Sequence, residues 1–341
     1  MPEAAPGDPT ADQPADQPPA DLIAALDPAT LLRALPPWMA AQIRPEAGDA
    51  GLPARAEAAV AAVIAAVEAE GAAAGAAGAA LQAARDLQDS FVAAGSGWRL
   101  FPADPLARRI SRAFMPLLLR TPDDGPPIQG TDHLDRFLSA GPPRRMIVCN
   151  HLSYTDTQAT DALLAAAGYA QADRLVAIAG PKVYTDPWRR VAAISLNTRK
   201  TPQSGAVTAG SPEAELPPRE LVRLALEAIS DCARLMDEGW IVLLYPEGTR
   251  SRDGRLQPWL RAAARYCAMP DLQILPLAQT GTDRVFPRDE SGMYPGAVRL
   301  RFGPALRPAE GRTGGLEQAR AALIALLPDG ARPDPDAPAL R

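Results

Sequence analysis

The sequence lacks the features that mark several large classes of protein. No stretch offers the ~18–20 uninterrupted apolar residues that a membrane-spanning helix requires. The nearest candidate, residues 58–67, consists largely of alanine and is followed by Glu68 and Glu70. The N-terminus also lacks a basic segment followed by an apolar core, so no signal peptide is expected. The sequence therefore predicts a protein that is soluble or that contacts a membrane only at its surface.

Common motifs of nucleotide-binding, metal-dependent and serine-dependent enzymes are also missing. The chain contains no G-x-x-x-x-G-K-[ST], G-x-G-x-x-G, H-E-x-x-H or G-x-S-x-G sequence. It has only 2 histidines and 3 scattered cysteines, which predict neither a metal site nor a cofactor. Cys149, Cys232 and Cys267 are instead typical of reduced, buried thiols in a cytoplasmic protein. The net charge of −5 gives no argument for nucleic acid as a partner, so any basic site must be local.

The first 120 residues are predicted to form a disordered tail followed by a helical domain. Residues 1–20 are rich in Pro, Ala and Asp and carry few large apolar side chains, which is typical of a disordered tail. Residues 21–120 predict an N-terminal helical domain, because apolar residues recur there at helical spacing. Within it, Pro28 interrupts the first helical run and Pro36-Pro37 is expected to end it.

The alanine-rich stretch over residues 54–94 contains three glycines near its middle, Gly71, Gly75 and Gly78. They fit either a bend or a close contact between two helices, and the sequence does not decide between these. Alanine-rich helices bury little area each, so this region is expected to need the rest of the protein for stability.

Residues 105–120 combine apolar side chains at helical spacing with four arginines, and Pro116 is expected to kink the helix. Two interpretations remain open. The segment could be a basic amphipathic helix on an anionic membrane surface, or a docking helix whose arginines are solvated.

Strands and helices alternate from about residue 131 onward. Strands are expected at 145–150, 175–179, 193–198, 240–245, 272–279 and 297–302, and helices at 156–167, 219–238, 258–268 and 316–327. This alternation predicts an α/β fold with a mostly parallel central sheet flanked by helices, preceded by the N-terminal helical domain. The α/β domain is placed at residues 121–328. Residues 203–216 are expected to form a mobile loop, and residues 329–341 a flexible tail.

His151 lies at the end of the first predicted strand, where open α/β sheets place their ligands. Asp156 follows five residues later. Its carboxylate could accept a hydrogen bond from Nδ1 of the imidazole and leave Nε2 able to take a proton. In the alternative interpretation, Thr155 or Asp156 only caps the next helix. The other histidine, His133, lies at a predicted helix N-terminus and is expected to be structural or exposed.

Basic residues follow two further strands of the predicted sheet. Arg250 and Arg252 lie in the loop after residues 240–245, where Pro246 and Gly248 favour a turn. Arg199-Lys200 follows the strand predicted at 193–198. Guanidinium groups bind phosphate with paired, charge-assisted hydrogen bonds. The sequence therefore predicts a phosphate site built from four cations at the edge of the sheet that carries His151.

Together these motifs resemble those of the glycerolipid acyltransferases. The resemblance rests on Asn150-His151-x-Ser153-x-x-Asp156 and on Pro246-Glu247-Gly248-Thr249-Arg250-Ser251, and it covers roughly residues 131–305. Residues 193–199 stand where the family has a glycine followed by an arginine, although Ala193 replaces the glycine. Leu275-Pro276-Leu277 is similar to the family's last block. Residues 179–187 also resemble the soluble, plastid-type glycerol-3-phosphate acyltransferases.

The resemblance implies acyl transfer from a thioester to a hydroxyl, without a metal, cofactor or covalent enzyme intermediate. It implies that His151 is the general base and that Asp156 orients it. The phosphate of the acceptor is expected to contact Arg199, Lys200, Arg250 and Arg252. Asn150, Ser153, Glu247, Gly248 and Thr249 are expected to line the substrate site, with Glu247 and Gly248 offering backbone N–H groups to the oxyanion.

The expected partners are therefore acyl-ACP or acyl-CoA as the donor and a phosphorylated glycerol as the acceptor. Glycerol-3-phosphate is the preferred acceptor at this point, with lysophosphatidate or another lysolipid as the alternative. A non-catalytic lipid-binding or membrane-adaptor protein is the competing class, with residues 105–120 as its membrane contact. The expected location is the cytoplasm, with peripheral contact at the inner face of the membrane.

Overall fold

The computed structural model describes residues 20–44, 49–139, 144–202, 216–290, 292–309, 311 and 313–341. Residues 1–19 and 203–215, which hold most of the predicted tail and of the predicted mobile loop, lie outside the described residues. In the part described, no helix is long and apolar enough to cross a membrane.

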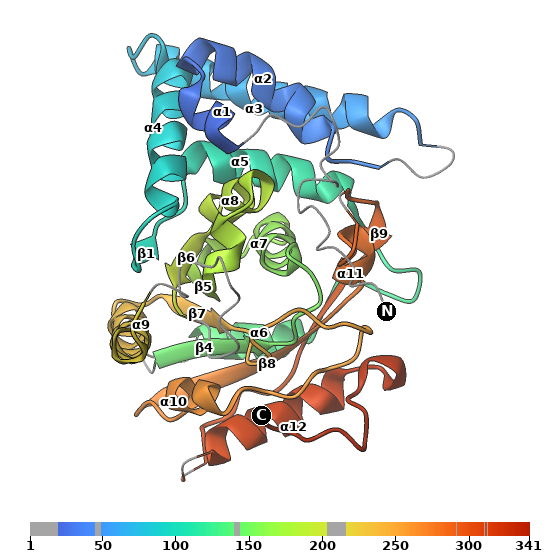
Figure 1. Cartoon of the computed structure of the whole chain (residues 1–341). Helices are drawn as coiled ribbons and strands as arrows, with labels where there is room; N and C mark the ends of the chain where they lie inside the picture. The colour runs from blue at the N-terminus through green and yellow to red at the C-terminus, as the bar shows by residue number, and fades with distance from the viewer. Residues whose placement is uncertain are drawn as a thin grey trace, which may run out of the picture.

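An eight-stranded sheet occupies the middle of the molecule (Figure 1). Its strand order is β1-β6-β5-β7-β4-β8-β10-β3. The strands are β1 (Leu100–Phe101), β3 (Ile128–Gln129), β4 (Arg144–Cys149), β5 (Leu175–Ala179), β6 (Asn197–Lys200), β7 (Ile241–Leu244), β8 (Leu272–Thr280) and β10 (Arg299–Phe302). The run from β6 to β8 is parallel throughout, whereas β1 and β10 are antiparallel to their inner neighbours. The predicted α/β fold with a mostly parallel sheet is thus confirmed.

Helices cover both faces of this sheet. They are α6 (Thr131–Ser139), α7 (Asp156–Ala166), α8 (Pro187–Ile194), α9 (Pro218–Asp237), α10 (Ala264–Cys267), α11 (Thr282–Val285) and α12 (Gly314–Leu326). Side chains alternate along a strand, so β4 sends Met146 and Val148 into a cluster with α9, α10 and α12. Ile147 and Cys149 point the other way and pack with α6 and α7. Both faces of β4 are therefore buried, as its continuous apolar sequence predicts.

The N-terminal helices form a layer on the far side of α7 and α8 from the sheet (Figure 1). They are α1 (Ala20–Ala25), α2 (Pro28–Ala40), α3 (Leu52–Ala73), α4 (Ala79–Ala94) and α5 (Pro105–Phe114). One hydrophobic cluster contains side chains of α2 to α5 together with side chains of α7 and α8. This shared core joins the two predicted domains. The domain boundary at residue 120 therefore stays a prediction.

The expected end of the first helical run at Pro36-Pro37 is wrong, since α2 continues through both prolines to Ala40. Each proline lacks an N–H group and removes a helical hydrogen bond. Trp38 and Met39 lie beyond the prolines and are 8% and 3% exposed. Burial of these two large side chains offsets the missing hydrogen bonds and keeps the last turn helical.

The glycines between α3 and α4 serve both purposes that the sequence left open. Gly75 and Gly78 adopt positive φ angles of 79° and 76° in the turn, a conformation that favours glycine. Gly71 lies against the start of α4, where an added Cβ atom would come 2.1 Å from the Cβ atom of Ala79. A bend and a close helix contact are therefore combined within one turn.

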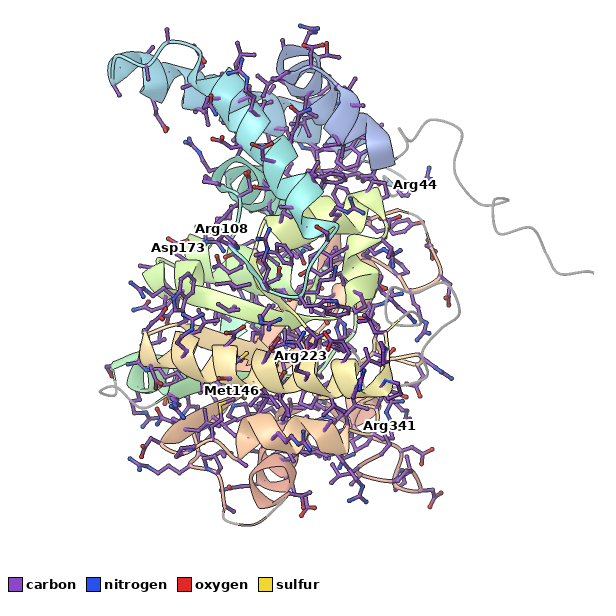
Figure 2. The ribbon with its side chains drawn as sticks, turned by 60° about the vertical axis from the view of Figure 1, so that its left-hand side comes forward. Arg44, Arg108, Met146, Asp173, Arg223 and Arg341 are labelled. Atoms are coloured by element: carbon purple, nitrogen blue, oxygen red, sulfur yellow. The ribbon has the colours of Figure 1, made fainter. Side chains whose placement is uncertain are left out.

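Helix α5 is a docking helix, because its apolar side chains Ile110 and Phe114 are buried in the protein. Its arginines are paired rather than merely solvated. Arg109 binds Glu70 at 2.7 Å, and Arg112 makes a two-pronged contact with Asp161 at 2.8 Å. Arg108 lies 3.7 Å from Asp173 (Figure 2). The apolar side of α5 thus faces the protein core and is not offered to a membrane surface. After α5, the 3₁₀ turn η1 (Met115–Leu117) contains Pro116 and leads to β2 (Leu119–Arg120), which pairs with β9 (Gly296–Ala297).

The third strand lies later in the sequence than expected. Residues 187–194 form α8, which begins after the capping carboxylate of Asp186, and β6 follows at residues 197–200. The apolar run over 191–196 fits both a buried helix end and a strand, so its periodicity alone misplaces the boundary. The short turns η2 (Ala170–Arg174) and η3 (Pro181–Tyr184) flank β5, and η4 (Arg261–Ala263) with α10 replaces the longer helix expected at 258–268.

Residues 329–341 differ from the flexible tail that the sequence predicts. They begin with η5 (Asp329–Ala331) and then run beside residues 256–261. Leu340 forms a parallel bridge with Trp259, whose side chain is fully buried. The high content of Pro and Asp suggested flexibility, but backbone pairing with a buried neighbour holds this segment in place.

Candidate functional site

A cavity of about 770 Å³ opens at the carboxyl ends of β4, β5 and β7. This is the edge where a parallel sheet is expected to bind its ligand. On the side away from the sheet, the cavity is closed by apolar side chains of the N-terminal helices and α8, namely Met39, Ile110, Phe114, Met115, Trp188 and Val191. Basic side chains from several segments also line the cavity. These are Lys182, Arg189, Arg250, Arg252, Arg261, Arg288 and Arg341, together with His151. Among the described residues that line it, none is Asp or Glu.

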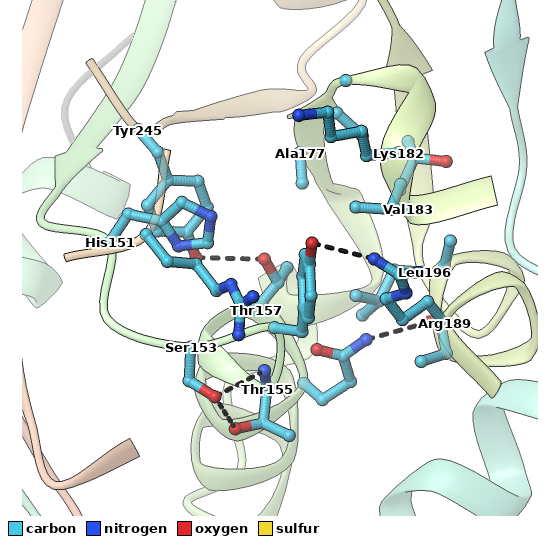
Figure 3. Close-up of a pocket in the computed structure, with 18 of the residues that line it drawn as sticks. His151, Ser153, Thr155, Thr157, Ala177, Lys182, Val183, Arg189, Leu196 and Tyr245 are labelled. Atoms are coloured by element: carbon cyan, nitrogen blue, oxygen red, sulfur yellow. Dashed lines mark hydrogen bonds between the residues drawn. The ribbon is translucent and has the colours of Figure 1, made fainter. Parts of the chain in front are cut away.

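His151 and Asp156 form the predicted pair. Nδ1 of His151 lies 2.8 Å from Oδ2 of Asp156, and the two side chains are 20% and 1% exposed. With its proton on Nδ1, the imidazole donates to the carboxylate and keeps the lone pair of Nε2 available. Figure 3 shows His151 beside Tyr245 at one side of the pocket, with Lys182, Val183 and Leu196 across from it.

The carboxylate of Asp156 does not cap its own helix. It accepts hydrogen bonds from the backbone N–H groups of Leu152 at 2.7 Å and Ser153 at 3.1 Å, both of which precede it in the chain. Thr155 occupies the N-cap position and makes no side-chain capping bond. Asp156 therefore fixes the loop after β4 and the ring of His151 at the same time, and the capping interpretation is not supported.

Tyr245 supports the imidazole from the neighbouring strand end. The two rings lie 4.6 Å apart between centroids, and the hydroxyl of Tyr245 is 3.0 Å from that of Thr157. Burial raises the pKa of Tyr245, so it remains a neutral phenol at physiological pH. The hydroxyl of Tyr245 thus adds a hydrogen bond to α7 without adding a charge.

Glu247 does not face the cavity. Its fully buried carboxyl accepts from the backbone N–H of His151 at 2.6 Å and from that of Gln257 at 2.8 Å. Burial raises its pKa to about 8, while the two backbone hydrogen bonds oppose that shift. Glu247 thus joins the loops after β4 and β7 and positions His151 through its backbone.

Gly248 lines the cavity at a turn whose backbone conformation favours glycine. Its φ angle is 63°, and an added Cβ atom would lie 2.2 Å from Cδ1 of Leu260. Its N–H donates to the carbonyl of Tyr245 at 3.0 Å within the turn. The expectation that this N–H faces the oxyanion therefore does not fit the structure. Thr249, the next residue, also lines the cavity.

Arg250 belongs to a cluster of guanidinium groups around Tyr154. It stacks on the ring of Tyr154 at 3.8 Å, while Arg189 donates to the Tyr154 hydroxyl at 3.0 Å. Burial lowers the pKa of Arg250, and the nearby positive charges of Arg288 and Arg189 act in the same direction. Arg252 also lines the cavity, from a more exposed position. A pocket that holds like charges close together favours an anionic ligand, because an anion relieves their repulsion.

Arg199 and Lys200 lie in β6 rather than after it, and the structure does not bring them into this cluster. The buried guanidinium of Arg199 binds Asp231 of α9 at 2.8 Å. The ammonium of Lys200 lies 4.9 Å from the ring centroid of Tyr184. In this strand it is Thr198 that lines the cavity. The predicted four-cation site is therefore corrected: Arg250 and Arg252 line the cavity, and Arg199 and Lys200 do not.

Asn150 and Ser153 use their side chains to fix the backbone of the loop after β4. The side chain of Asn150 exchanges two hydrogen bonds with the backbone of Gln279 in β8, at 2.9 and 2.8 Å. Ser153 also lines the cavity, but its hydroxyl donates to the carbonyl of Phe286 at 2.8 Å. Both residues tie the loop after β4 to neighbouring segments. His133 lies on α6, away from the cavity lining, 2.8 Å from the guanidinium of Arg136.

Several cavity residues were missed by the sequence analysis, above all Tyr154, Lys182, Arg189, Arg288 and Arg341. Asp186-Pro187 signals a helix start, which places Arg189 in the first turn of α8. Nothing in the sequence shows that this turn faces His151. No group of acidic, histidine or cysteine side chains suited to a metal ion was found among the residues that the structure describes.

Comparison with known proteins shows which proteins the chain is similar to. Residues 131–280 match the model of the Acyltransferase family. A 1-acyl-sn-glycerol-3-phosphate acyltransferase of Chlamydomonas reinhardtii is 32% identical over 31% of this chain and 32% of its own length. The chloroplastic enzyme BAT2 of Brassica napus is 32% identical over 21% of each chain. The chain thus matches a third or less of the length of these relatives. The solved structure of the acyltransferase PlsC from Thermotoga maritima is 17% identical, covering 65% of this chain and 80% of that one with a TM-score of 0.42.

Proposed function

We propose that the protein transfers an acyl group from a thioester to the hydroxyl of 1-acyl-sn-glycerol-3-phosphate, and the match of residues 131–280 to the Acyltransferase family model supports this reaction class. The observation that carries this proposal is a His–Asp pair placed in the same cavity as a cluster of arginines. The pair supplies proton transfer, and the arginines supply a site for the acceptor phosphate. The relatives' names support the choice of acceptor.

The chemistry follows from the orientation of the imidazole. Nε2 of His151 takes the proton of the acceptor hydroxyl while its oxygen attacks the thioester carbonyl carbon. Collapse of the tetrahedral intermediate breaks the carbon–sulfur bond, and the imidazolium returns the proton to the departing thiolate. Asp156 keeps the ring in the required tautomer and stabilises the positive charge that forms on it. General base catalysis of this kind contributes about 10²–10⁴-fold to the rate.

The two ends of the cavity fit the two parts of a lysophosphatidate. Arg250, stacked on Tyr154, and Arg189 are placed to bind the phosphate. Binding the phosphate there would hold the acceptor hydroxyl near His151 and reduce the entropy lost on reaction. Side chains such as Phe114, Trp188 and Met293 offer an apolar surface to acyl chains. Because glycerol-3-phosphate has no acyl chain to occupy this surface, it becomes the second choice of acceptor, as an alternative arm of the test below. Acyl-CoA and acyl-ACP as donors, and a cytoplasmic location, stay predictions.

The two histidines of this chain provide a matched test. Purified protein would be incubated with lysophosphatidate or glycerol-3-phosphate, each combined with acyl-CoA or acyl-ACP, and ester formation would be measured. We expect His151→Ala to lower kcat by about 10²–10⁴-fold with lysophosphatidate. His133→Ala is the control, because His133 lies outside the cavity lining and should retain wild-type turnover.

Three other outcomes of this assay would change the proposed acceptor, base or function. If wild-type protein forms ester only with glycerol-3-phosphate, the acceptor is corrected and the mechanism stands. If His151→Ala keeps near-wild-type turnover, the assignment of the base is wrong. If no pairing yields ester although the protein binds lysophosphatidate, the chain is a lipid-binding protein that retains the fold.

A further inference from the structure

Residues 329–341, here called the strap, end beside the cavity, which Arg341 lines. The strap is bonded by its backbone to residues 256–261, which we call the inner loop. The N–H of Leu256 donates to Ala331 at 3.0 Å, and that of Trp259 donates to Ala339 at 3.0 Å. The N–H of Arg341 donates to Trp259 at 2.8 Å, and Arg261 donates to Arg341 at 2.9 Å. Backbone hydrogen bonds given and accepted in this way are those of a short paired strand, and they hold the backbone of Arg341 in place.

The inner loop in turn contacts the turn after β7. The N–H of Leu260 donates to the carbonyl of Pro246 at 2.8 Å. The side chain of Leu260 packs where Gly248 has no Cβ atom. Strap, inner loop and turn are therefore stacked in that order, and the strap is positioned relative to His151 through the turn.

The guanidinium of Arg341 reaches past the inner loop to the turn itself. One of its NH₂ groups donates to the carbonyl oxygen of Glu247 at 2.8 Å, and the residue lines the cavity. Its positive charge also acts to lower the pKa of the Glu247 carboxyl, against the effect of burial. A guanidinium carries five N–H donors in a planar fork, so one bond to a carbonyl leaves donors for a ligand.

We propose that Arg341 is an anion-binding residue of the cavity, with its fork shared between the carbonyl of Glu247 and a phosphate of the bound ligand. This proposal rests on the proposed function. The described cavity lining contains no Asp or Glu side chain that could pair with Arg341 instead. A phosphate is the anion expected there, because lysophosphatidate and the phosphopantetheine-bearing donors all carry one. Bidentate contact with phosphate is the geometry that a guanidinium favours.

Steady-state kinetics with each substrate varied in turn would test this and separate the two phosphate sources. We expect Arg341→Ala to raise the KM for either lysophosphatidate or acyl-CoA by about tenfold or more, with kcat within about threefold of wild type. The substrate whose KM rises identifies the phosphate. Arg341→Lys should recover part of the loss, because an ammonium keeps the charge but not the fork. Arg332→Ala is the control within the strap, since Arg332 pairs with Asp329 and does not line the cavity.

Two results would overturn the proposal. In one, kcat and both KM values stay unchanged in Arg341→Ala. In the other, kcat falls while both KM values stay unchanged, which would make Arg341 a positioning residue for the turn alone. Thermal unfolding of each variant shows whether it is folded; if Arg341→Ala is not, Arg341→Lys and Arg341→Gln carry the same comparison.

Calorimetric binding separates failure of this proposal from failure of the proposed function. Lysophosphatidate, monoacylglycerol and coenzyme A would be titrated without a second substrate. We expect Arg341→Ala to weaken one phosphorylated ligand by about tenfold or more and to leave monoacylglycerol unchanged. If wild-type protein is inactive but shows this difference, the proposed function fails and the anion site stands. If wild-type protein is active but the variant binds all three normally, the anion site fails and the proposed function stands.

Discussion

The ends of β6 and β7 both carry basic residues, but only those that follow β7 line the cavity. Both strands are parallel, separated only by β5 in the sheet, and each brings two basic residues near its end. Arg199 and Lys200 still belong to β6, where they pair with Ile178 and Ala179 of β5. A residue inside a strand has its direction fixed by the pleat, so Arg199 points to α9 and meets Asp231.

At β7 the strand ends before the basic residues begin. Pro246 and Gly248 turn the chain there, and Arg250 extends from the loop into the cavity. In this chain the two cations inside the ladder of β6 stay out of the cavity lining, whereas Arg250, which follows the end of the β7 ladder, is part of it. Proline and glycine between the strand and the cation are the sequence signal for that end of the ladder.

The largest effect that we expect from this difference between β6 and β7 is on stability, and it concerns Arg199→Ala. Arg199→Ala leaves Asp231 without its buried partner and removes a long packed side chain, so the free energy of unfolding should fall by about 3 kcal/mol. The exposure of Asp231, 36%, places the expected loss at the lower end of the range for buried pairs. Urea denaturation would measure it, and the KM for a phosphorylated acceptor should remain as in wild type. A raised KM with unchanged stability would mean that Arg199 binds substrate after all.

Arg250→Ala should change the KM for the acceptor and leave the stability of the protein nearly unchanged. Loss of a charged hydrogen bond to phosphate, worth ~1.5–3 kcal/mol, should raise the KM for lysophosphatidate about tenfold or more. The free energy of unfolding should not fall by much, because the substitution also removes repulsion among Arg250, Arg189 and Arg288. Arg255→Ala is the control on the same loop, since Arg255 is exposed and does not line the cavity. If Arg250→Ala and Arg255→Ala have equal KM values, the phosphate site lies elsewhere.

The same contrast explains what could be predicted from the sequence. The His–Asp pair could be found because a strand, a short loop and a helix N-terminus determine its geometry within a few residues of chain. The strands β4, β5, β7 and β8 could be found because continuous apolar runs of that length fit buried strands. Arg199 was misplaced because the apolar run over residues 191–196 belongs partly to α8, which moved the strand boundary and put Arg199 inside the ladder.

Residues that reach the cavity from distant segments could not be predicted at all. Tyr154 and Arg189 meet only because α8 packs against the loop after β4. Arg341 reaches the turn after β7 only because the strap pairs with the inner loop. Such contacts depend on tertiary packing, and local propensity and periodicity carry no information about them.

The smallest expected effect concerns the buried carboxyl group of Glu247 in the turn after β7. Asp231 pairs with the arginine of β6, but Glu247 at the end of β7 binds backbone N–H groups and is buried without an arginine salt bridge in the described structure. Its pKa is raised from an ordinary value of 4.5 to about 8. Between those pH values the folded protein holds a proton that the unfolded chain has lost. This group therefore makes the protein less stable as pH rises, by up to about 1.4 kcal/mol per pH unit.

Glu247→Gln removes this titration, because an amide does not ionise. The free energy of unfolding of the variant, measured in urea at pH 6, 7 and 8, should fall less steeply with pH than that of wild type, whatever its absolute value. Glu220→Gln is the control, since Arg223 lowers the pKa of that carboxyl and it is ionised in both states over this range. Equal slopes for wild type and Glu247→Gln would show that Glu247 is already ionised at pH 6. The backbone N–H groups of His151 and Gln257 would then be sufficient to stabilise its charge.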